Sequence, residues 1–222
     1  DPAYVAPYAA RLRHEVSRPI LVTGRFNRPQ EAARALQDGS ADMIGMTRAQ
    51  ICDPDMARKT FDGRADDIRV CIACNQACIG HYALGCPISC IQHPETGREL
   101  EYDTLRPTRS TREVIVIGGG PAGLKAASIA AQRGHHVVLY EKEPRLGGQV
   151  LLAQRLPDRA EFGGLVTNLE REARAAGVEI QLGASLSAAR LRELNPHVAI
   201  VATGAVPHWP SLDLGDSAHV VD

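Results

Sequence analysis

The first part of the chain alternates between stretches with helical periodicity and short, mostly apolar runs. Apolar side chains recur every three or four positions in the helical stretches, whereas the short runs are typical of buried parallel strands. Asn27 is expected to cap the second helix. This alternation predicts the last two units of a (β/α)8 TIM barrel, the C-terminal part of that fold. The helices are predicted at residues 2–16 and 29–36 and after Asp53, and the strands at residues 18–24 and 41–46.

The last part of the chain has a second, more regular alternation of strands and helices. It begins after a basic linker, Thr108–Arg112, that contains Thr and Ser. Buried strands alternate there with helices, which predicts an α/β domain of the Rossmann-like type. The strands are predicted at residues 113–117, 137–140, 178–182 and 198–202, and the helices at residues 121–133 and 162–176.

Residues 68–107 lie between these two parts and differ from both in composition. They are rich in Cys, Gly, Pro and His, and no long period runs through them. Such a segment cannot bury enough apolar surface to fold unaided, so a metal centre is expected to supply the missing cohesion. The sequence therefore predicts three domains, at residues 1–66, 67–108 and 109–222.

The overall charge and hydropathy exclude several classes of partner. The 222 residues carry a formal net charge of -1 and a pI of about 6.8, so no strong attraction to nucleic acid or to an anionic membrane is expected. No apolar run approaches the roughly 18 residues that span a bilayer, and Asp1 opens the chain without a leader sequence. We expect a soluble, cytoplasmic protein. Because the chain lacks an initial Met and enters a repeating fold partway, we also expect a fragment of a longer protein.

Four cysteines form a compact pattern in the middle segment. Cys71, Cys74, Cys78 and Cys90 follow the spacing C-x2-C-x3-C-x11-C. Thiolates bind iron well, and three from one short loop plus one later return suit a 4Fe-4S cluster. A zinc-stabilised NAD-binding protein is the alternative, although zinc favours two C-x2-C pairs and only one is present. The crowding of five cysteines into residues 71–90 argues against a disulfide framework.

Two further cysteines stand outside this pattern. Cys86 lies in the same loop and is expected to be a small apolar filler, and Cys52 is expected to pack within the barrel. Neither is expected to bind metal.

A glycine-rich turn marks the start of the third domain. The run Gly118-Gly119-Gly120-Pro121-Ala122-Gly123 follows a strand and opens a helix, so a dinucleotide pyrophosphate can approach the bare backbone there. Glu141 ends the next strand, where a carboxylate can accept hydrogen bonds from both ribose hydroxyls of an adenosine; a solvent-facing acid is the alternative. Two later glycine-containing turns favour FAD over NAD. The residues expected to hold FAD are Gly118, Gly120, Ala122, Gly123, Glu141, Gly148, Gln149, Thr203 and Gly204.

Together these motifs resemble the iron-sulfur flavoproteins related to bacterial 2,4-dienoyl-CoA reductase and trimethylamine dehydrogenase, across essentially the whole chain. Residues 69–78 resemble the cluster loop of that family, with the x3 spacing of its reductase branch. Val22-Thr23-Gly24-Arg25 and Gly45-Met46-Thr47-Arg48 resemble the last two phosphate-holding turns of its barrel. The resemblance implies that an FMN phosphate is held by Gly24, Arg25, Thr47 and Arg48. An exposed surface charge is the alternative for each arginine.

The resemblance also implies an activity. Such proteins combine an FMN-bearing barrel, a 4Fe-4S cluster and a domain pair similar to glutathione reductase, whose nicotinamide-binding domain is expected shortly after residue 222. Electrons are then expected to pass from NAD(P)H through FAD and the cluster to FMN, where a small-molecule substrate reacts. No catalytic residue is assigned, because the proton-donating residues of the family come from earlier barrel strands that this sequence does not contain.

The substrate stays open at this point. The cluster spacing favours an enoyl or dienoyl thioester, whereas residues 87–92 and 96–99 resemble relatives that demethylate amines or proline betaine oxidatively. A different class of function is the alternative, in which the chain is an electron-transfer module without catalytic activity. A homo-oligomer is compatible with the sequence, and neither nucleic acid nor membrane is expected as a partner.

Overall fold

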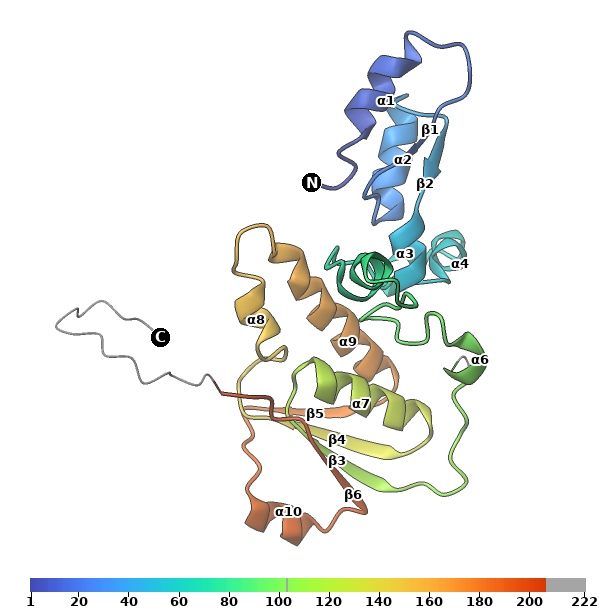
Figure 1. The fold of residues 1–222 in the computed structure, drawn as a ribbon. Helices are drawn as coiled ribbons and strands as arrows, with labels where there is room; N and C mark the ends of the chain where they lie inside the picture. The colour runs from blue at the N-terminus through green and yellow to red at the C-terminus, as the bar shows by residue number, and fades with distance from the viewer. Residues whose placement is uncertain (103, 207–222) are drawn as a thin grey trace, which may run out of the picture.

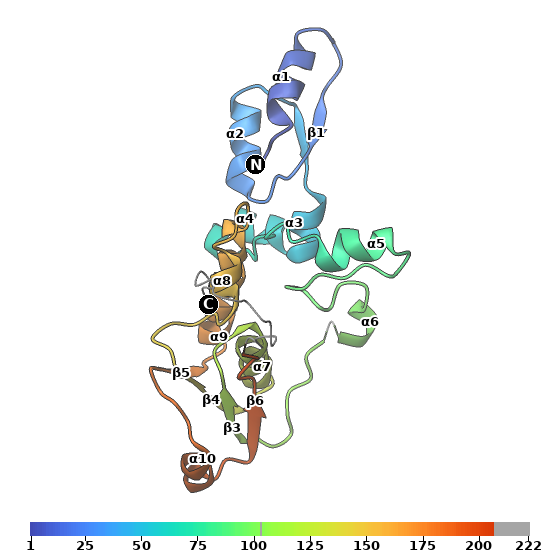
Figure 2. The same cartoon turned by 60° about the vertical axis from the view of Figure 1, so that its left-hand side comes forward.

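The computed structural model describes residues 1–102 and 104–206, so residue 103 and residues 207–222, at the end of the third predicted domain, lie outside it. Figure 1 shows an elongated molecule in which an N-terminal α/β part, the cysteine-containing segment and a four-stranded sheet follow one another from top to bottom. The middle part still lies between the other two from a second direction (Figure 2). Within the described ranges, no helix is both long and apolar enough to cross a bilayer.

The N-terminal part consists of two parallel strands flanked by helices. The strands β1 (Leu21–Thr23) and β2 (Met43–Gly45) pair with Leu21 opposite Met43, and α1 (Ala6–Arg13) and α2 (Pro29–Gln37) pack beside them. This order agrees with the predicted barrel units. Because the strands are parallel, the turns that follow them meet at the same end of the sheet. The buried core of this part consists of Ala9, Ile20, Val22, Phe26, Ala35 and Ala41.

The start of α2 differs from the prediction in its cap. The carboxylate of Glu31 accepts the backbone N–H of Asn27 at 2.7 Å and that of Arg28 at 3.1 Å, and Arg28 occupies the cap position. A carboxylate in the first turn also interacts favourably with the positive end of the helix. The prediction that Asn27 caps this helix is therefore wrong, because Glu31 supplies the acceptor from inside the first turn.

The cysteine-containing segment has little regular structure. Its apolar residues are buried in the cores on either side: Ile68 packs with Ala49 and Met56, while Ile72 joins the core of the sheet domain. The neighbouring cores therefore contribute to the cohesion that the sequence analysis expected from a metal centre. The helical elements leading into it are α3 (Thr47–Cys52) and α4 (Met56–Phe61), and its own short turns are η1 (Ala65–Asp67), the π-helical η2 (Gln76–Gly80), α5 (His81–Ala83) and α6 (Glu99–Tyr102).

The third part is a parallel sheet with strand order β5-β4-β3-β6. The helices α7 and α9 pack against each other on one face of this sheet (Figure 1). Val116, Leu124 and Leu139 lie between the layers with no exposed surface. This is the Rossmann-like layout that the sequence predicts. Its elements are β3 (Glu113–Ile117), α7 (Pro121–Gln132), β4 (His136–Glu141), α8 (Val150–Ala153), η3 (Ala160–Phe162), α9 (Gly163–Ala175), β5 (Glu179–Leu182), α10 (Ala188–Leu194) and β6 (Val198–Val201).

The helix α10 is not among the elements expected from the sequence. It is only seven residues long and begins at Ser187, whose Oγ accepts the backbone N–H of Arg190 at 3.1 Å. A serine cap of this kind stabilises a short helix by about 1 kcal/mol. The element therefore depends on its cap rather than on a long apolar stripe.

The glycine-rich turn joins β3 to α7 through close backbone contacts. Gly118 has a φ of +111°, and a Cβ added there would lie 2.4 Å from the carbonyl oxygen of Ala202 at the end of β6. A Cβ added to Gly123 would lie 1.9 Å from the carbonyl oxygen of Gly118, so α7 rests directly on the turn. Around Gly120 no atom lies within 4 Å of the added Cβ, and this side of the turn is open.

Gly123→Ala is expected to destabilise the sheet domain by at least about 2 kcal/mol, because the new methyl group overlaps backbone that cannot move aside. Gly120→Ala is the matched control and should unfold at the wild-type midpoint. Chemical denaturation followed by circular dichroism measures both. Equal midpoints for the two variants would show that α7 does not pack on the turn as described.

Candidate functional site

The four cysteines of the spaced pattern line one cavity. Cys71, Cys74, Cys78 and Cys90 come together there from a stretch without regular structure, the η2 turn and a later loop. Each of the four is partly buried. The remaining walls are mostly apolar and are formed by Arg48, Ile51, Ile72, Asn75, Ala77, Ile91 and Gln92.

The backbone bends sharply around this cavity. Ala73 and Asn75 adopt left-handed conformations with φ of +52° and +57°, although neither is glycine. Each such residue costs on the order of 1 kcal/mol or more, so the surrounding structure must hold it in place. The carbonyl oxygen of Asn75 accepts the N–H of Gly80 at 2.8 Å and closes the turn that carries Cys78. The local strain therefore lies where the thiols are turned toward a common space.

The four thiols share the wall of this one cavity. Among the described residues, no three His, Cys, Asp or Glu side chains are placed to hold a single metal ion. A zinc ion requires its sulfur ligands at about 2.3 Å. Four thiols in one cavity are the donor set of a 4Fe-4S cluster.

Hydrogen bonding and burial act in opposite directions on the thiols. Burial raises the pKa of Cys71 and that of Cys74. A hydrogen bond from the Cys52 thiol lowers the pKa of Cys90 to about 6, and this effect exceeds the opposing effect of burial. The same hydrogen bond, together with burial, raises the pKa of Cys52. Cys90 therefore favours the thiolate form that binds metals, and Cys52 remains a thiol.

Of the two cysteines outside the pattern, Cys86 departs from its expected role and Cys52 is buried as expected. Cys86 is exposed, with its Sγ 3.8 Å from the carbonyl oxygen of Leu84, so the prediction that it fills an apolar space is wrong. Cys52 is fully buried, as expected, but it lies at the junction with the cysteine segment, where Gln92 Nε2 donates to its Sγ at 3.3 Å. Neither residue lines the cysteine cavity.

The residues expected to hold a phosphate also lie together. Gly24, Arg25, Thr47 and Arg48 line one cavity at the ends of β1 and β2. The Nε of Arg25 is buried there without a hydrogen-bond partner, while its Nη2 pairs with Glu161 Oε2 at 2.7 Å. A buried donor without a partner is rare, so a bound acceptor such as a phosphate fits this site.

Arg48 belongs to both cavities. Its side chain lines the phosphate cavity and the cysteine cavity, and its Nη1 donates to Asn75 Oδ1. Its positive charge also lowers the pKa of Cys71, although the effect of burial is larger. The two cavities are therefore neighbours with a guanidinium between them.

The third group of predicted residues converges on the glycine-rich turn. Glu141 is buried, and its carboxylate accepts the N–H of Gly119 at 2.6 Å and that of Glu143 at 2.9 Å. Gly120 faces the open side of the turn, where a pyrophosphate can approach. Ala122 has its backbone in the first turn of α7, but its methyl group lines a groove on the outer side of that helix.

The later turns complete this surface. A Cβ added to Gly148 would lie 3.4 Å from the Cα of Gly120, and Thr203 lies beside Gly118. Gln149 Nε2 donates to the carbonyl oxygen of Ala205 at 2.8 Å, which ties this turn to the segment containing Gly204. All the residues expected to contact FAD therefore lie around the carboxyl ends of β3, β4 and β6.

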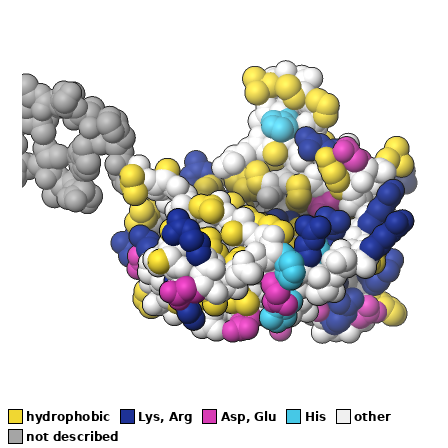
Figure 3. Space-filling model, turned by 90° about the horizontal axis from the view of Figure 1, so that it is seen from below, with side chains coloured by type: hydrophobic (Ala, Val, Ile, Leu, Met, Phe, Trp, Pro, Cys, Tyr) yellow, Lys and Arg dark blue, Asp and Glu magenta, His cyan; other side chains and the backbone are white. Residues whose placement is uncertain are grey.

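The outer groove of about 980 Å³ lies away from the cysteines, between α7, the linker and β6. Figure 3 shows apolar side chains gathered between Lys and Arg side chains when the molecule is viewed from below. No cysteine lines this groove, and Ala122 is the one predicted site residue among its lining residues.

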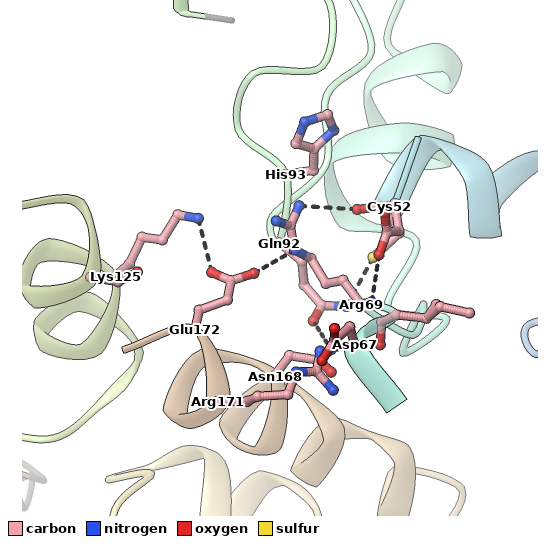
Figure 4. Close-up of polar contacts among 12 residues, drawn as sticks. Cys52, Asp67, Arg69, Gln92, His93, Lys125, Asn168, Arg171 and Glu172 are labelled. Atoms are coloured by element: carbon pink, nitrogen blue, oxygen red, sulfur yellow. Dashed lines mark hydrogen bonds and ion pairs between the residues drawn. The ribbon is translucent and has the colours of Figure 1, made fainter. Parts of the chain in front are cut away.

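A polar junction that the sequence did not predict joins the cysteine segment to the sheet domain (Figure 4). Arg69 Nε donates to Glu172 Oε1 at 2.8 Å, and Lys125 Nζ lies 3.3 Å from Glu172 Oε2. Burial would raise the pKa of Glu172, but the charges and hydrogen bonds of Arg69 and Lys125 hold it below its usual value. Beside them, Asn168 Nδ2 donates to Gln92 Oε1 at 2.8 Å. These partners are up to 103 positions apart in the chain, so no local pattern reveals them.

Two family descriptions match separate parts of the chain. Residues 4–67 match the NADH:flavin oxidoreductase / NADH oxidase family, and residues 113–202 match FAD dependent oxidoreductases. A metal reductase of Desulforamulus reducens is 38% identical over 99% of this chain and 33% of its own length. An N,N-dimethylglycine/sarcosine dehydrogenase of Chromohalobacter salexigens is 36% identical over 90% of this chain and 30% of its own length.

A solved structure has the same fold over nearly all of the chain. A 2-naphthoyl-CoA reductase in complex with 2-naphthoyl-CoA superposes with a TM-score of 0.89 and 29% identity, covering 95% of this chain and 32% of that one. The chain thus spans about a third of each of these relatives. It belongs to the NADH:flavin oxidoreductase family of flavoproteins related to 2,4-dienoyl-CoA reductase and trimethylamine dehydrogenase.

Proposed function

We propose that this chain is the electron-relay part of an NAD(P)H-dependent iron-sulfur flavoprotein oxidoreductase. When bound, FAD, a 4Fe-4S cluster and FMN would carry electrons from a nicotinamide to the substrate. The observation that carries this proposal is the position of Arg48, which lies in the walls of both the four-cysteine cavity and the phosphate cavity. Two redox groups held in these cavities would be close neighbours.

Each group has its own set of residues in the proposal. Cys71, Cys74, Cys78 and Cys90 would hold the cluster as thiolates, within the partly buried and mostly apolar cavity described above. FMN would be held through its phosphate, and the N–H groups and guanidinium groups of Gly24, Arg25, Thr47 and Arg48 are the donors available for it. The backbone around Gly120 would receive the FAD pyrophosphate, and Glu141 the adenosine ribose.

The boundaries proposed for these functions are residues 1–66 for the FMN-binding barrel units, 67–108 for the cluster segment, and 109–222 for the FAD-binding domain. The extent of the NADH:flavin oxidoreductase match, residues 4–67, supports the first boundary. The second falls in the exposed linker that precedes β3. NAD(P)H would bind to a further domain of the whole protein.

We favour an enoyl or dienoyl thioester as the substrate class. Two observations support it: the x3 spacing of the cysteine loop, and the similarity to a reductase that binds a naphthoyl thioester. The likeness to a dimethylglycine dehydrogenase supports oxidative N-demethylation as the alternative. Two assays of the full-length protein separate these activities. Reduction of enoyl thioesters is measured with NAD(P)H as the electron donor, and oxidation of methylated amines is measured with an artificial electron acceptor. Flavin and iron reduction without turnover of either class would favour a non-catalytic electron-transfer module.

Cys74→Ala is expected to abolish cluster binding, because the loss of one of four thiolate ligands leaves an iron site open. Iron and acid-labile sulfide in anaerobically purified full-length protein should fall from near four of each per chain, the content of a 4Fe-4S cluster, to near zero. Cys86→Ala, which removes an exposed cysteine outside the cavity, should keep both. Zinc without sulfide in the unmodified protein would contradict the cluster assignment.

Glu141→Gln is expected to weaken FAD binding about tenfold or more, because a charged acceptor for hydroxyl groups becomes a neutral amide. Quenching of FAD fluorescence during titration of the FAD-depleted protein gives the affinity. Glu143→Gln changes an exposed neighbouring carboxylate and serves as the control. Equal FAD affinity for the two variants would remove Glu141 from the ribose site.

Arg48→Met is expected to weaken FMN binding about tenfold or more while leaving riboflavin binding unchanged, since riboflavin lacks the phosphate. Arg58→Met, at an exposed position outside both cavities, is the control. Both ligands should be measured on the flavin-depleted full-length protein. A parallel loss of riboflavin affinity would mean that Arg48 supports the fold of the cavity rather than the phosphate.

A further inference from the structure

Glu172 pairs with one cation from the cysteine segment and with another from α7. Arg69 Nε donates to its Oε1 at 2.8 Å, and Lys125 Nζ lies 3.3 Å from its Oε2. Only 17% of the Glu172 side chain is exposed, against 18% for Arg69 and 24% for Lys125. Among the ion pairs of residues 1–102 and 104–206, no other carboxylate is shared between the cysteine segment and α7.

The two cations belong to elements that lead to two different proposed redox sites. Arg69 shortly precedes Cys71, which lines the cysteine cavity. Lys125 belongs to α7, and this helix begins directly after Gly120, on the open side of the glycine-rich turn. Figure 4 shows Lys125 and Arg69 reaching Glu172 from opposite sides. Glu172 therefore joins the start of the cysteine segment to the helix that opens the proposed FAD turn.

Each cation is also fixed to its own part of the molecule. The backbone N–H of Arg69 donates to Asp53 Oδ2 at 2.7 Å, and its Nη1 donates to the carbonyl oxygen of Cys52 at 3.1 Å. The helix that carries Lys125 rests on the glycine-rich turn at Gly123, where an added Cβ would overlap the backbone of the turn. A break in the link between the two cations would therefore let the cysteine cavity and the glycine-rich turn move relative to each other.

We propose that Glu172 is a positioning residue that sets the separation between FAD and the iron-sulfur cluster, and with it the rate of electron transfer between them. This inference rests on the proposed function. A hydride from NAD(P)H would bring two electrons to FAD, which would pass them one at a time to the cluster and release its protons to solvent, and the cluster would pass each electron to FMN before it takes the next. Transfer between groups that do not touch weakens steeply as their separation grows. Asn168 and Arg171 also hold α9 on the segment, so the loss of Glu172 would displace the two sites rather than separate them.

The test follows FAD and the cluster in the anaerobic full-length holoprotein after rapid mixing with NAD(P)H. Flavin absorbance reports the reduction of FAD, and the electron paramagnetic resonance signal of rapidly frozen samples reports the reduction of the cluster. Glu172→Gln keeps the size of the side chain but can accept hydrogen bonds at only one of its two terminal groups, because the other is a donor. It should slow cluster reduction about tenfold, since a displacement of about 1 Å between reacting groups can cost a hundredfold. The rate of FAD reduction and the contents of iron, sulfide and FAD should stay at wild-type values.

Glu170→Gln is the matched control, because Glu170 lies on the same helix and pairs with Arg174 inside it at 2.8 Å. Its cluster should be reduced at the wild-type rate. Arg69→Met should slow cluster reduction in the same way as Glu172→Gln. The double variant should be no slower than the slower of the two single variants, because both changes break the same contact.

Cluster reduction as fast in Glu172→Gln as in Glu170→Gln would overturn the proposal. Effects of Arg69→Met and Glu172→Gln that multiply in the double variant would also overturn it, because the two residues would then act separately. Loss of iron, sulfide or FAD in Glu172→Gln alone would have the same consequence, because Glu172 would then maintain a binding site rather than the separation between two intact sites. If Glu172→Gln does not fold, these criteria apply to Lys125→Met, which removes only one of the two cations. Wild-type protein without iron or sulfide would instead contradict the proposed function itself.

Discussion

The burial of Ile68 and Ile72 on opposite sides fixes the cysteine segment between two cores. Ile68 is 2% exposed within the cluster around Met56, and Ile72 is 4% exposed within the core of the sheet domain. Each buried isoleucine contributes roughly 1.5–3 kcal/mol, which is large for a segment with almost no regular structure. Ile72 lies between Cys71 and Cys74, so the same insertion that holds the segment also positions its first two thiols. The packing of its neighbours thus shapes the cavity.

Polar contacts make this arrangement specific. The backbone N–H of Arg69 donates to Asp53 Oδ2 at 2.7 Å on one side, and its guanidinium reaches Glu172 on the other. Asp53 is also paired with Lys59 at 2.6 Å, and this pairing together with the Arg69 N–H outweighs burial and lowers the pKa of Asp53. A buried polar group left without its partner costs about 1–3 kcal/mol. Any sliding of the segment against either neighbour would break several of these bonds, so apolar burial supplies the attraction and the polar groups select one position.

Local patterns reveal the parts of this molecule but not their junction. The strands, the glycine-rich turn and the spacing of the cysteines are recognisable because each depends on residues close together in the chain. The pairing of Gln92 with Asn168 spans 76 positions, and glutamine or asparagine alone indicates no role. The cap of α2 by Glu31 and the exposure of Cys86 could not be predicted either, because competing acceptors and surrounding atoms decide them. Sequence therefore identifies the ligands, and only the fold identifies what surrounds them.

The short helix α3 explains why the two cavities lie so close together. Its first two residues, Thr47 and Arg48, line the phosphate cavity, and Ile51, near its end, lines the cysteine cavity. Six helical residues span only about 9 Å, and a hydrogen-bonded helix changes little in length. The separation between a phosphate group at one end and a thiolate-bound group at the other is therefore set by a rigid element rather than by loops. An insertion within α3 would move the cavities apart even if every ligand were kept, which makes the length of this helix as restrictive as the identity of the cysteines.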